Sequence, residues 1–447
     1  MSARSVAAEV LVRVERDKAF AAAALEAEIA RAVQLDPRDR ALATELVYGS
    51  LRVLPWLRVQ IEKHARKGKS NVDPKTFAQI AVAAYQLFFL TRVPAFAAVN
   101  EAVEGVRRAK GPRVAAFANA VLRKLATEAG EMAQMGNGRE RLLIDALATS
   151  TAPWLSEALA RSLGEDDAKR FLEASMVPPP VCLRVEDARE RDAWIEKLRA
   201  AAEGADIEAG KASPLAITLR GAGKPQALPG FREGAWSVQE EGSQVVALAV
   251  GARPGEHVLD ACAGRGNKSA LLARAVRPSG ALDAADVHAS KLDRLRDELT
   301  RVGLAPRALH SVDWTVGSGD VTELYDRVLV DAPCSGIGTL RRRPELAARR
   351  AGEDLAALAA MQLAICVRAA DHVKPGGRLV YAVCSVLREE AEDVVEKLCA
   401  ARPELAPDVF DADAVRAIAR DASSFRLLPY AEGTDGYFVA MLRTRAP

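Results

Sequence analysis

Apolar residues recur at helical spacing through the first third of the chain. Between residues 4 and 127 they fall three and four positions apart, the period at which one face of a helix meets a core. Asp36-Pro37 and Asp73-Pro74 are typical helix starts. Helix breaks are predicted at Gly49, at Gly111-Pro112 and at Gly130. The pattern therefore predicts a compact all-α domain. Its apolar positions are Val6, Val10, Leu11 and Val14, then Leu42, Leu46 and Val47, then Ile80, Tyr85, Leu87 and Phe88, then Val99, Val103 and Val106, then Phe117, Val121 and Leu122.

A short stretch of mixed pattern follows. Pro153 opens a helical run to about Met176, and the stiff connector Val177–Pro180 ends it. Beyond the connector, alternating apolar residues, an amphipathic segment and a second alternating run predict a small α+β module that ends near residue 234. Its strands are predicted at residues 181–185 and 215–219, and its helix at 192–202.

From residue 239 onward, strand-like runs alternate with helical ones. Repeated strand–helix units are typical of a parallel sheet covered by helices on both faces. The predicted strands are residues 257–261, 281–285, 308–311, 327–330, 378–382 and 437–442. The predicted helices are residues 243–250, 268–275, 291–302, 354–372 and 389–401.

Length and pattern together predict a multidomain chain. Its 447 residues suffice for about three domains at roughly 150 residues each. We predict an all-α domain over residues 1–130, a helical linker with the small α+β module over 131–236, and a Rossmann-like α/β domain over 237–447. Ligands of open α/β sheets bind outside the carboxyl ends of the strands, so the third domain should carry the chemistry.

The composition narrows the class of protein. Hydrophobic residues make up 49% of the chain and charged residues 27%, as in ordinary globular proteins. No run approaches the ~18 apolar residues that cross a bilayer, so no membrane partner is expected. Six cysteines in so long a chain do not form a disulfide framework, which favours reduced thiols in a cytoplasmic protein. There is no C-x-x-C, and the five histidines are scattered, so no metal is expected.

Charge is uneven along the sequence. Residues 1–150 hold 23 Lys and Arg against 16 Asp and Glu, a net +7, so the +2 of the whole chain leaves −5 for the remainder. A basic first third suits docking to a polyanion, and an Arg-rich helical surface without such a partner explains it equally well. The densest basic run is predicted on a loop and comprises Lys63, Arg66, Lys67 and Lys69.

A glycine-rich loop follows the first strand of the α/β domain. Within Asp260–Lys268, Gly264 and Gly266 permit a tight turn and close approach of the backbone to a ligand at a helix start. Asp286 ends the next strand, where a carboxylate can hold ribose hydroxyls. Asp313 follows the third strand, where it can hold an adenine amino group or cap a turn. The glycine spacing is not G-x-G-x-x-G, yet NAD and S-adenosylmethionine both carry a ribose, so Asp286 does not separate them.

Two cysteine-bearing turns follow two further strands. Cys334 lies in Asp331-Ala332-Pro333-Cys334, and Cys384 follows the strand-like run at residues 378–381. Enzymes that methylate amino groups carry an aromatic residue where Cys334 stands, which argues against N-methylation. A thiolate that adds to C6 of a pyrimidine makes C5 able to attack a sulfonium methyl. An acid near N3, such as Asp331, would favour cytosine, so the residues indicate covalent methyl transfer to a pyrimidine carbon.

The residues alone leave open which cysteine attacks. Either sulfur can lie in the electropositive setting that lowers a thiol pKa, supplied by Lys268, Arg342 and Arg343. The two arginines also suit nucleic-acid phosphates, or they form a solvated basic turn. The remaining cysteines are predicted to be structural: Cys182, Cys262, Cys366 and Cys399.

Along nearly the whole chain, these residues resemble the Sun-type (Fmu/RsmB) family of bacterial 16S rRNA cytosine-C5 methyltransferases. Asp331–Gly338 with Arg342–Glu345 is similar to the family's fourth methyltransferase motif, and Cys384-Ser385 to its sixth. Gln239–Gln244 resembles the segment before the cofactor loop, and Gly433–Ala440 the closing motif. The resemblance implies S-adenosylmethionine as cofactor and a monomer that acts on 16S rRNA, with the helix 31 loop as the expected target.

The first domain resembles a NusB-type RNA-binding helical domain. The small module is expected to be similar to RRM or ferredoxin-like domains. Because the chain carries a NusB-type domain beside the catalytic one, it is similar to the two-part members of the family rather than to relatives that consist of the catalytic domain alone. The matching residues within 4–127 are Tyr48-Gly49, Val93-Pro94, Asn100–Val103 and Asn119–Arg123.

The family resemblance also implies roles for individual residues. By its pattern, Cys384 attacks C6 and Cys334 assists release, with Asp331 and Lys268 as further catalytic residues. The implied RNA-binding residues are Arg342 and Arg343. The implied cofactor contacts are Cys262, Ala263, Gly264, Arg265, Gly266, Asn267, Lys268, Asp286, Asp313 and Asp331.

The sequence departs from the family pattern at two places. Gly264-Arg265 stands where Ala-Pro is usual, with Asn267 in place of a glycine, and Val383 replaces a threonine. Neither departure removes a reacting group. Three other functions stay open: the same chemistry on tRNA, an RNA-binding protein with an inactive methyltransferase domain, and a nicotinamide dehydrogenase, for which the sequence supplies no hydride-transfer acid.

Overall fold

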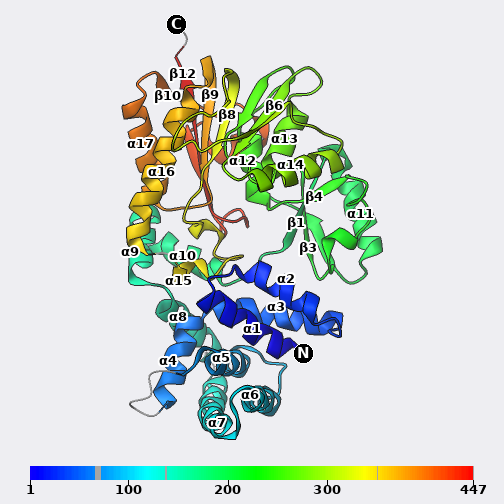
Figure 1. The fold of residues 1–447 in the computed structure, drawn as a ribbon, viewed down its shortest axis with the longest axis vertical. Coiled ribbons are helices and arrows are strands. Elements are labelled where there is room, and N and C mark those ends of the chain that lie inside the picture. The colour runs from blue at the N-terminus through cyan, green and yellow to red at the C-terminus, as the bar shows by residue number, and fades with distance from the viewer. Residues whose placement is uncertain (66–71, 136–137, 350, 446–447) are drawn as a thin grey trace. The chain divides into compact units, whose positions relative to one another are not determined.

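The computed structural model of the chain describes residues 1–65, 72–135, 138–349 and 351–445 (Figure 1). These residues pack into two compact units. The helical unit comprises Met1–Ser156, Ser175–Val177 and Leu340–Arg349, and the sheet unit comprises the rest. The predicted domain boundaries at residues 130 and 236 stay predictions. Of the basic run, Arg66, Lys67 and Lys69 lie outside the described residues.

The helical unit confirms the predicted helix starts. Asp36 and Asp73 precede α3 and α5, where each side chain accepts a hydrogen bond from a backbone N–H of the first turn. Proline follows each cap at the position where its missing N–H costs nothing. The helices of this unit are α1 (Ala3–Arg16), α2 (Ala21–Arg31), α3 (Pro37–Arg52), α4 (Leu54–His64), α5 (Pro74–Phe89), α6 (Ala95–Lys110), α7 (Pro112–Gln134), α8 (Gly138–Ser150) and α15 (Leu346–Arg349).

The predicted helix break at Gly49 is wrong, because α3 continues through it to Arg52. The predicted break at Gly130 is wrong as well, because this residue lies inside α7, which continues to Gln134. A Cβ at Gly49 would come within 2.1 Å of the Tyr85 ring. Glycine is therefore needed there for the close approach of α3 to α5, rather than for a turn. At Gly111 the break is confirmed, since this residue takes a φ of +84° between α6 and α7.

The small α+β module forms an antiparallel sheet in the order β2-β3-β1-β4. The predicted strand at 181–185 is confirmed, whereas β2 and β4 were not predicted. Trp236 of β4 is fully buried, and it packs in one core with Leu183 and Ile217. The elements of this region are α9 (Pro153–Leu163), α10 (Glu165–Ser175), β1 (Val181–Val185), α11 (Arg191–Ala201), β2 (Asp206–Ala209), β3 (Ala216–Arg220) and β4 (Trp236–Val238).

The larger sheet has the order β10-β12-β9-β8-β5-β6-β7, with β11 paired to β12. Helices cover both of its faces, as predicted: α16 and α17 lie on one side, and α12, α13 and α14 on the other (Figure 1). The strands are β5 (His257–Asp260), β6 (Ala281–Asp286), β7 (Ala308–Ser311), β8 (Tyr325–Asp331), β9 (Val373–Val383), β10 (Leu405–Pro407), β11 (Ser424–Leu427) and β12 (Tyr437–Thr444). The helices are α12 (Glu241–Ala249), α13 (Asn267–Ala275), α14 (Ala289–Arg301), α16 (Gly352–Ala370), α17 (Glu392–Ala401) and α18 (Asp413–Ala419).

The predicted parallel sheet is confirmed for β5 to β9 and is wrong for the last strands. Strands β5 to β9 pair in parallel, but β12 runs antiparallel to β9, and β10 and β11 run antiparallel to β12. The connection from β11 to β12, residues 428–436, is too short for the crossover helix that a parallel neighbour needs. The last strands therefore close the sheet as antiparallel neighbours.

The carboxyl ends of the parallel strands meet at one edge of the sheet. Asp260 ends β5, Asp286 ends β6, and Asp331 ends β8. Among the described residues, no helix is both long and apolar enough to pass through a membrane. Within the same residues, no cluster of three His, Cys, Asp or Glu side chains is arranged as metal ligands would be.

Candidate active site

The two cysteine-bearing turns meet at the carboxyl edge of the sheet. Cys334 lies three residues beyond β8, and Cys384 directly follows β9. Because β8 and β9 pair in parallel, with Asp331 opposite Ala382, their turns lie side by side. The two sulfur atoms are 3.2 Å apart. The structure therefore brings together the two thiols that the sequence singled out.

Glycines hold the backbone around Cys384. The Gly338 N–H donates to the Cys384 carbonyl at 3.0 Å, and the Gly436 N–H donates to the Gly338 carbonyl at 2.7 Å. A Cβ at Gly338 would come within 1.9 Å of the Gly436 oxygen. Three separate segments thus approach so closely that only glycine fits at position 338, which fixes the turn that carries Cys384.

A lysine–aspartate pair lies beside Cys384. The Lys268 ammonium, from α13, donates to Asp331 Oδ2 at 2.6 Å, and the two side chains are only 12% and 25% exposed. Burial by itself lowers the pKa of Lys268, but the charge and hydrogen bond of Asp331 outweigh it and raise the pKa overall. The charge of a Cys384 thiolate raises it further, so the ammonium lies within electrostatic reach of that sulfur.

Cys334 has different surroundings. Its hydrogen bond with Cys384 and its burial raise the pKa of the Cys334 thiol well above the ordinary value, and the charges of Cys384 and Glu390 add to the effect. Cys334 therefore keeps its proton at neutral pH. This arrangement can hold one thiolate and one thiol in contact.

The glycine-rich loop leaves room for a ligand. Gly264 has a φ of +57°, and among the described residues nothing lies within 4 Å of where its Cβ would be. Its N–H donates to Asp286 Oδ2 at 3.0 Å. Gly266, with a φ of +87°, begins α13, and a Cβ there would come within 2.7 Å of Leu295. One glycine thus leaves space above the loop, and the other lets α13 pack against α14.

Asp260 was not predicted as a site residue. It is buried at the end of β5, where its Oδ2 accepts from the Ser269 hydroxyl at 2.7 Å. Its Oδ1 is buried and, within the described residues, meets no donor in good hydrogen-bond geometry. Burial raises the pKa of Asp260 to about 7, although the Ser269 hydroxyl lowers it. A buried oxygen with spare hydrogen-bonding capacity at this edge suits a polar ligand.

The other predicted cofactor residues differ in burial and in their hydrogen bonds. Cys262 is half-buried, and burial followed by the charge of Asp260 raises the pKa of its thiol well above the ordinary value. Asp313 hydrogen-bonds within its own turn, to the Thr315 hydroxyl and N–H, and these bonds lower its pKa. The rest of the loop comprises Ala263, which is buried, and Arg265 and Asn267, which are exposed.

Arg342 and Arg343 belong to the helical unit and not to the unit that holds the cysteines. Their segment is fixed there by hydrogen bonds, because Glu345 accepts from the Ala21 N–H at 3.1 Å and the Arg341 carbonyl accepts from Arg52 at 2.9 Å. The Arg343 guanidinium lies 5.8 Å from the centre of the Phe20 ring. Arg342 is half-buried. Their contact with RNA stays a prediction.

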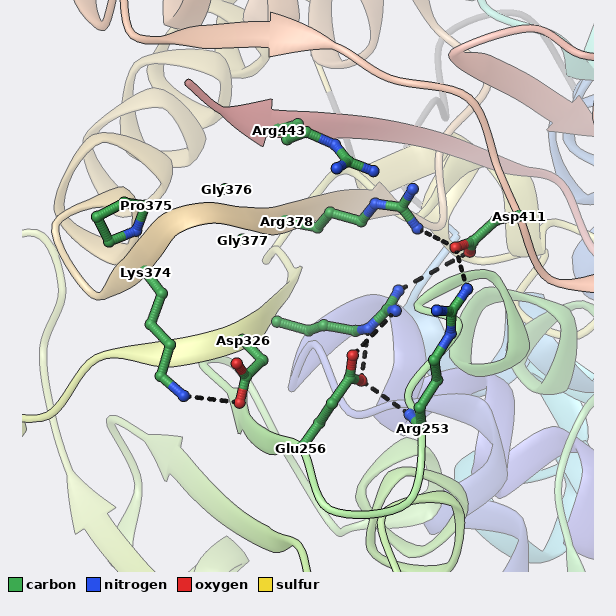
Figure 2. A pocket seen from close by; sticks show the side chains of 11 residues that line it. Arg253, Glu256, Asp326, Lys374, Pro375, Gly376, Gly377, Arg378, Asp411 and Arg443 are labelled. Atoms are coloured by element: carbon green, nitrogen blue, oxygen red, sulfur yellow. Dashed lines mark hydrogen bonds and ion pairs between the residues drawn. The ribbon is translucent and has the colours of Figure 1, made fainter. Parts of the chain in front are cut away.

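A second cavity, of about 260 Å³, lies at the opposite edge of the sheet, where β5, β8 and β9 begin (Figure 2). Figure 2 shows Lys374, Arg378 and Arg253 paired with carboxylates of the cavity, and Arg443 pairs with Asp408 at 2.8 Å. The pairs include Arg327–Glu256 at 2.7 Å, Lys374–Asp326 at 2.8 Å, Arg253–Asp411 at 2.6 Å and Arg378–Asp411 at 2.6 Å. These ion pairs hold the amino ends of the strands together, which is a structural role for the charged residues of this cavity. The cysteine edge is therefore the stronger candidate for catalysis.

Comparison with family models agrees with the fold. Residues 247–443 match the family described as 16S rRNA methyltransferase RsmB/F, and residues 1–127 match the NusB family. Residues 152–225 match the ferredoxin-like domain of RsmF/B-like methyltransferases. The fold and these family matches therefore define a methyltransferase-type α/β domain in a chain that also carries a NusB domain.

Relatives are similar along the whole chain. Ribosomal RNA small subunit methyltransferase B of Pseudomonas putida is 33% identical over 450 residues, which cover 99% of this chain and 98% of that protein. The protein of the same name from Erwinia tasmaniensis is 32% identical over 91% of this chain and 90% of its own length. The chain belongs to the ribosomal RNA small subunit methyltransferase B family. This confirms the resemblance found in the sequence.

Solved structures share the fold. The crystal structure of PH0851 covers 99% of both chains with a TM-score of 0.80 at 23% sequence identity. The structure of NSun6 from Pyrococcus horikoshii with SFG covers 66% of this chain and 99% of its own, with a TM-score of 0.56 at 18% identity. The predicted fold class, a helical NusB-like domain with a small α+β module and a Rossmann-like domain, is confirmed.

Proposed function

We propose that this protein methylates C5 of a cytosine in 16S rRNA, with S-adenosylmethionine as the methyl donor. The observation that carries the proposal is the pair of sulfurs 3.2 Å apart beside the Lys268–Asp331 ion pair. Family membership supports ribosomal RNA as the substrate, since the relatives are named for it. The helix 31 loop as target, a monomeric state and a cytoplasmic location stay predictions.

The glycine-rich loop and its neighbours fit the proposed cofactor. The open space at Gly264 suits a ligand that rests against the loop backbone, and Asp286 offers a carboxylate beside it. Asp260 contributes a buried oxygen with spare hydrogen-bonding capacity. Asp313 is proposed for the adenine end. When bound, S-adenosylmethionine supplies a sulfonium methyl group to the pyrimidine carbon.

In the proposed reaction, the Cys384 thiolate forms a bond to C6 of the cytosine, and this addition makes C5 nucleophilic. The Lys268 ammonium favours the thiolate electrostatically and holds Asp331, which hydrogen-bonds to the N3 edge of the base. After C5 carries the methyl group, loss of its proton to a base and cleavage of the Cys384–C6 bond restore the aromatic ring. Cys334, in contact with Cys384, assists this release.

The experiment that tests the proposal separates the two thiols. Purified Cys384→Ala, Cys334→Ala and wild-type proteins are incubated with protein-free 16S rRNA and radiolabelled S-adenosylmethionine, then resolved by denaturing electrophoresis. We expect Cys384→Ala to yield neither methylated RNA nor covalent adduct, and Cys334→Ala to accumulate the adduct. Cys366→Ala, which alters a fully buried cysteine in α16, serves as the matched control and should behave like wild type.

The opposite result would reverse the assignment. An adduct trapped by Cys384→Ala, with none from Cys334→Ala, would make Cys334 the nucleophile. Bulk tRNA in a parallel reaction tests the alternative substrate, and methylation of tRNA alone would exclude the rRNA proposal. Isothermal titration of S-adenosylmethionine tests the inactive-protein alternative, which predicts no cofactor binding.

A further inference from the structure

A fully buried carboxyl group lies behind the turn that carries Cys334. Glu390 has no exposed surface, and its Oε1 accepts a hydrogen bond from the Ser335 N–H at 2.7 Å. Its Oε2 accepts from the Ser335 hydroxyl at 2.5 Å. Ser335 is the residue directly after Cys334, so the backbone that carries the sulfur is held by a bidentate contact.

A second side chain holds the other flank of the same turn. The Gln362 amide, from α16, donates to the Pro333 carbonyl at 2.9 Å and to Glu390 Oε1 at 3.0 Å. The Tyr381 hydroxyl, from β9, donates to the Glu390 carbonyl at 2.6 Å. Pro333 and Ser335 are the two neighbours of Cys334 in the chain. The position of the sulfur is thus fixed from both sides by a network that contains Glu390.

We propose that Glu390 is a positioning residue for Cys334, and that it keeps this thiol in contact with Cys384 for the release step. The inference rests on the proposed function. The two Glu390 oxygens together take part in three hydrogen bonds, from the Ser335 N–H, the Ser335 hydroxyl and the Gln362 amide. Loss of these acceptors would remove both contacts that Glu390 makes with Ser335, and the Ser335 hydroxyl would keep its longer hydrogen bond to Ser385 at 3.3 Å. Because the Ser335 N–H is buried, the turn should move toward a new acceptor.

The contacts of Glu390 connect it to the breakdown of the covalent adduct and not to cofactor binding or adduct formation. Lys268 and Asp331 hydrogen-bond to each other, and the Gly264 N–H donates to Asp286, so cofactor binding and attack by Cys384 do not depend directly on the Glu390 carboxyl group. A displaced Cys334 turn should therefore leave adduct formation in place and slow its breakdown. A shift of about 1 Å in a reacting group can cost roughly 100-fold in rate.

The experiment follows the covalent adduct in a single turnover. Wild type, Glu390→Leu and Glu390→Gln are mixed with 16S rRNA and S-adenosylmethionine, and samples quenched over time are resolved on denaturing gels. We expect Glu390→Leu to form the adduct and release it about 100-fold more slowly. Glu390→Gln should release faster than Glu390→Leu, because its amide oxygen can still accept from the Ser335 N–H and the serine hydroxyl can reverse its direction.

Two further variants keep the test decisive. Glu389→Gln alters the neighbouring carboxyl group, which pairs with Arg161 instead, and should release like wild type. Ser335→Ala removes the hydroxyl alone and should slow release by about tenfold. If the melting curve of Glu390→Leu shows that this variant does not fold, the release rate of Ser335→Ala decides whether the contact between Glu390 and Ser335 supports release.

The outcomes distinguish this inference from the proposed function. Adduct accumulation in Cys334→Ala together with wild-type release in folded Glu390→Leu would overturn the role of Glu390 alone. Wild-type release in Ser335→Ala would overturn it if Glu390→Leu cannot be used. Absence of a Cys384-dependent adduct in every variant would instead overturn the proposed function.

Discussion

The Lys268–Asp331 ion pair offers a direct test of the site's electrostatics. Lys268→Met keeps most of the apolar stem and removes the ammonium 2.6 Å from the Asp331 carboxylate. At that distance and an effective dielectric constant of about 20, the attraction is about 6 kcal/mol before desolvation is counted. Removing one partner of a buried pair costs about 3–5 kcal/mol. Because Asp331 is 25% exposed, we expect the lower figure, about 3 kcal/mol.

Thermal unfolding measures this loss. For a domain of roughly 150–250 residues, each kcal/mol lowers Tm by about 2–4 °C, so Lys268→Met should melt at least about 6 °C below wild type. Lys374→Met is the matched control, since Lys374 pairs with Asp326 at 2.8 Å but the two side chains are 38% and 32% exposed. Its expected cost is about 0–1 kcal/mol.

A double variant tests whether the unpaired Asp331 carboxylate causes the loss of stability in Lys268→Met. Lys268→Met with Asp331→Asn leaves no unpaired carboxylate, so it should recover about half of the Tm lost in Lys268→Met. Equal losses in Lys268→Met and Lys374→Met, or strictly additive losses in the double variant, would refute the reasoning that burial makes this pair consequential. Activity should also fall in Lys268→Met, because the ammonium that favours the Cys384 thiolate is gone.

Three further predictions follow from individual contacts. Hydrogen peroxide should link Cys334 to Cys384 by a disulfide, because the two sulfurs are already 3.2 Å apart. Two thiols and one peroxide give one disulfide and two waters, so mass spectrometry should show the loss of two hydrogens. Cys384→Ser is the control and should show no such loss. Burial raises the pKa of Asp260 from 3.8 to about 7, so its contribution to stability is complete below the unfolded value and is lost as pH rises through the folded one. Asp260→Asn should therefore remove a decline of roughly 1.4 kcal/mol per pH unit between about pH 4 and 7, seen as a flatter Tm profile. Gly338→Ala should abolish activity and lower Tm, since its Cβ would meet backbone within 1.9 Å, whereas Gly317→Ala, with open space around it, should melt like wild type.

Local signals in the sequence were sufficient for much of the fold. The Asp-Pro caps of α3 and α5 and the strand at 181–185 depend on neighbouring residues alone, so the sequence could predict them. The meeting of the two cysteines could also be predicted, because carboxyl ends of adjacent parallel strands share one edge. Each of these inferences needs only the period of the pattern and the direction of the strands.

Features that depend on distant contacts could not be predicted. Gly49 has the appearance of a helix break until Tyr85, from another helix, is placed against it. The antiparallel pairing of β12 with β11 depends on a connection whose shortness becomes apparent only once β11 is recognised. Arg342 and Arg343 follow the Cys334 motif closely in sequence, yet Glu345 in the same segment bonds to the Ala21 N–H of the helical unit. In each case the deciding partner is remote along the chain.

The same reasoning explains why the residues alone left the roles of the two cysteines open. Both thiols follow a strand and a short turn, so their local sequence does not separate them. The two thiols differ in the ionisable groups that surround each sulfur. Lys268 and Tyr437 lie within electrostatic reach of Cys384, whereas the charge of Glu390 acts on Cys334. These groups come from α13, β12 and the segment after β9. A cation thus lies near one sulfur and an anion near the other, and this asymmetry supports the proposed roles, in which Cys384 attacks the base and Cys334 assists release.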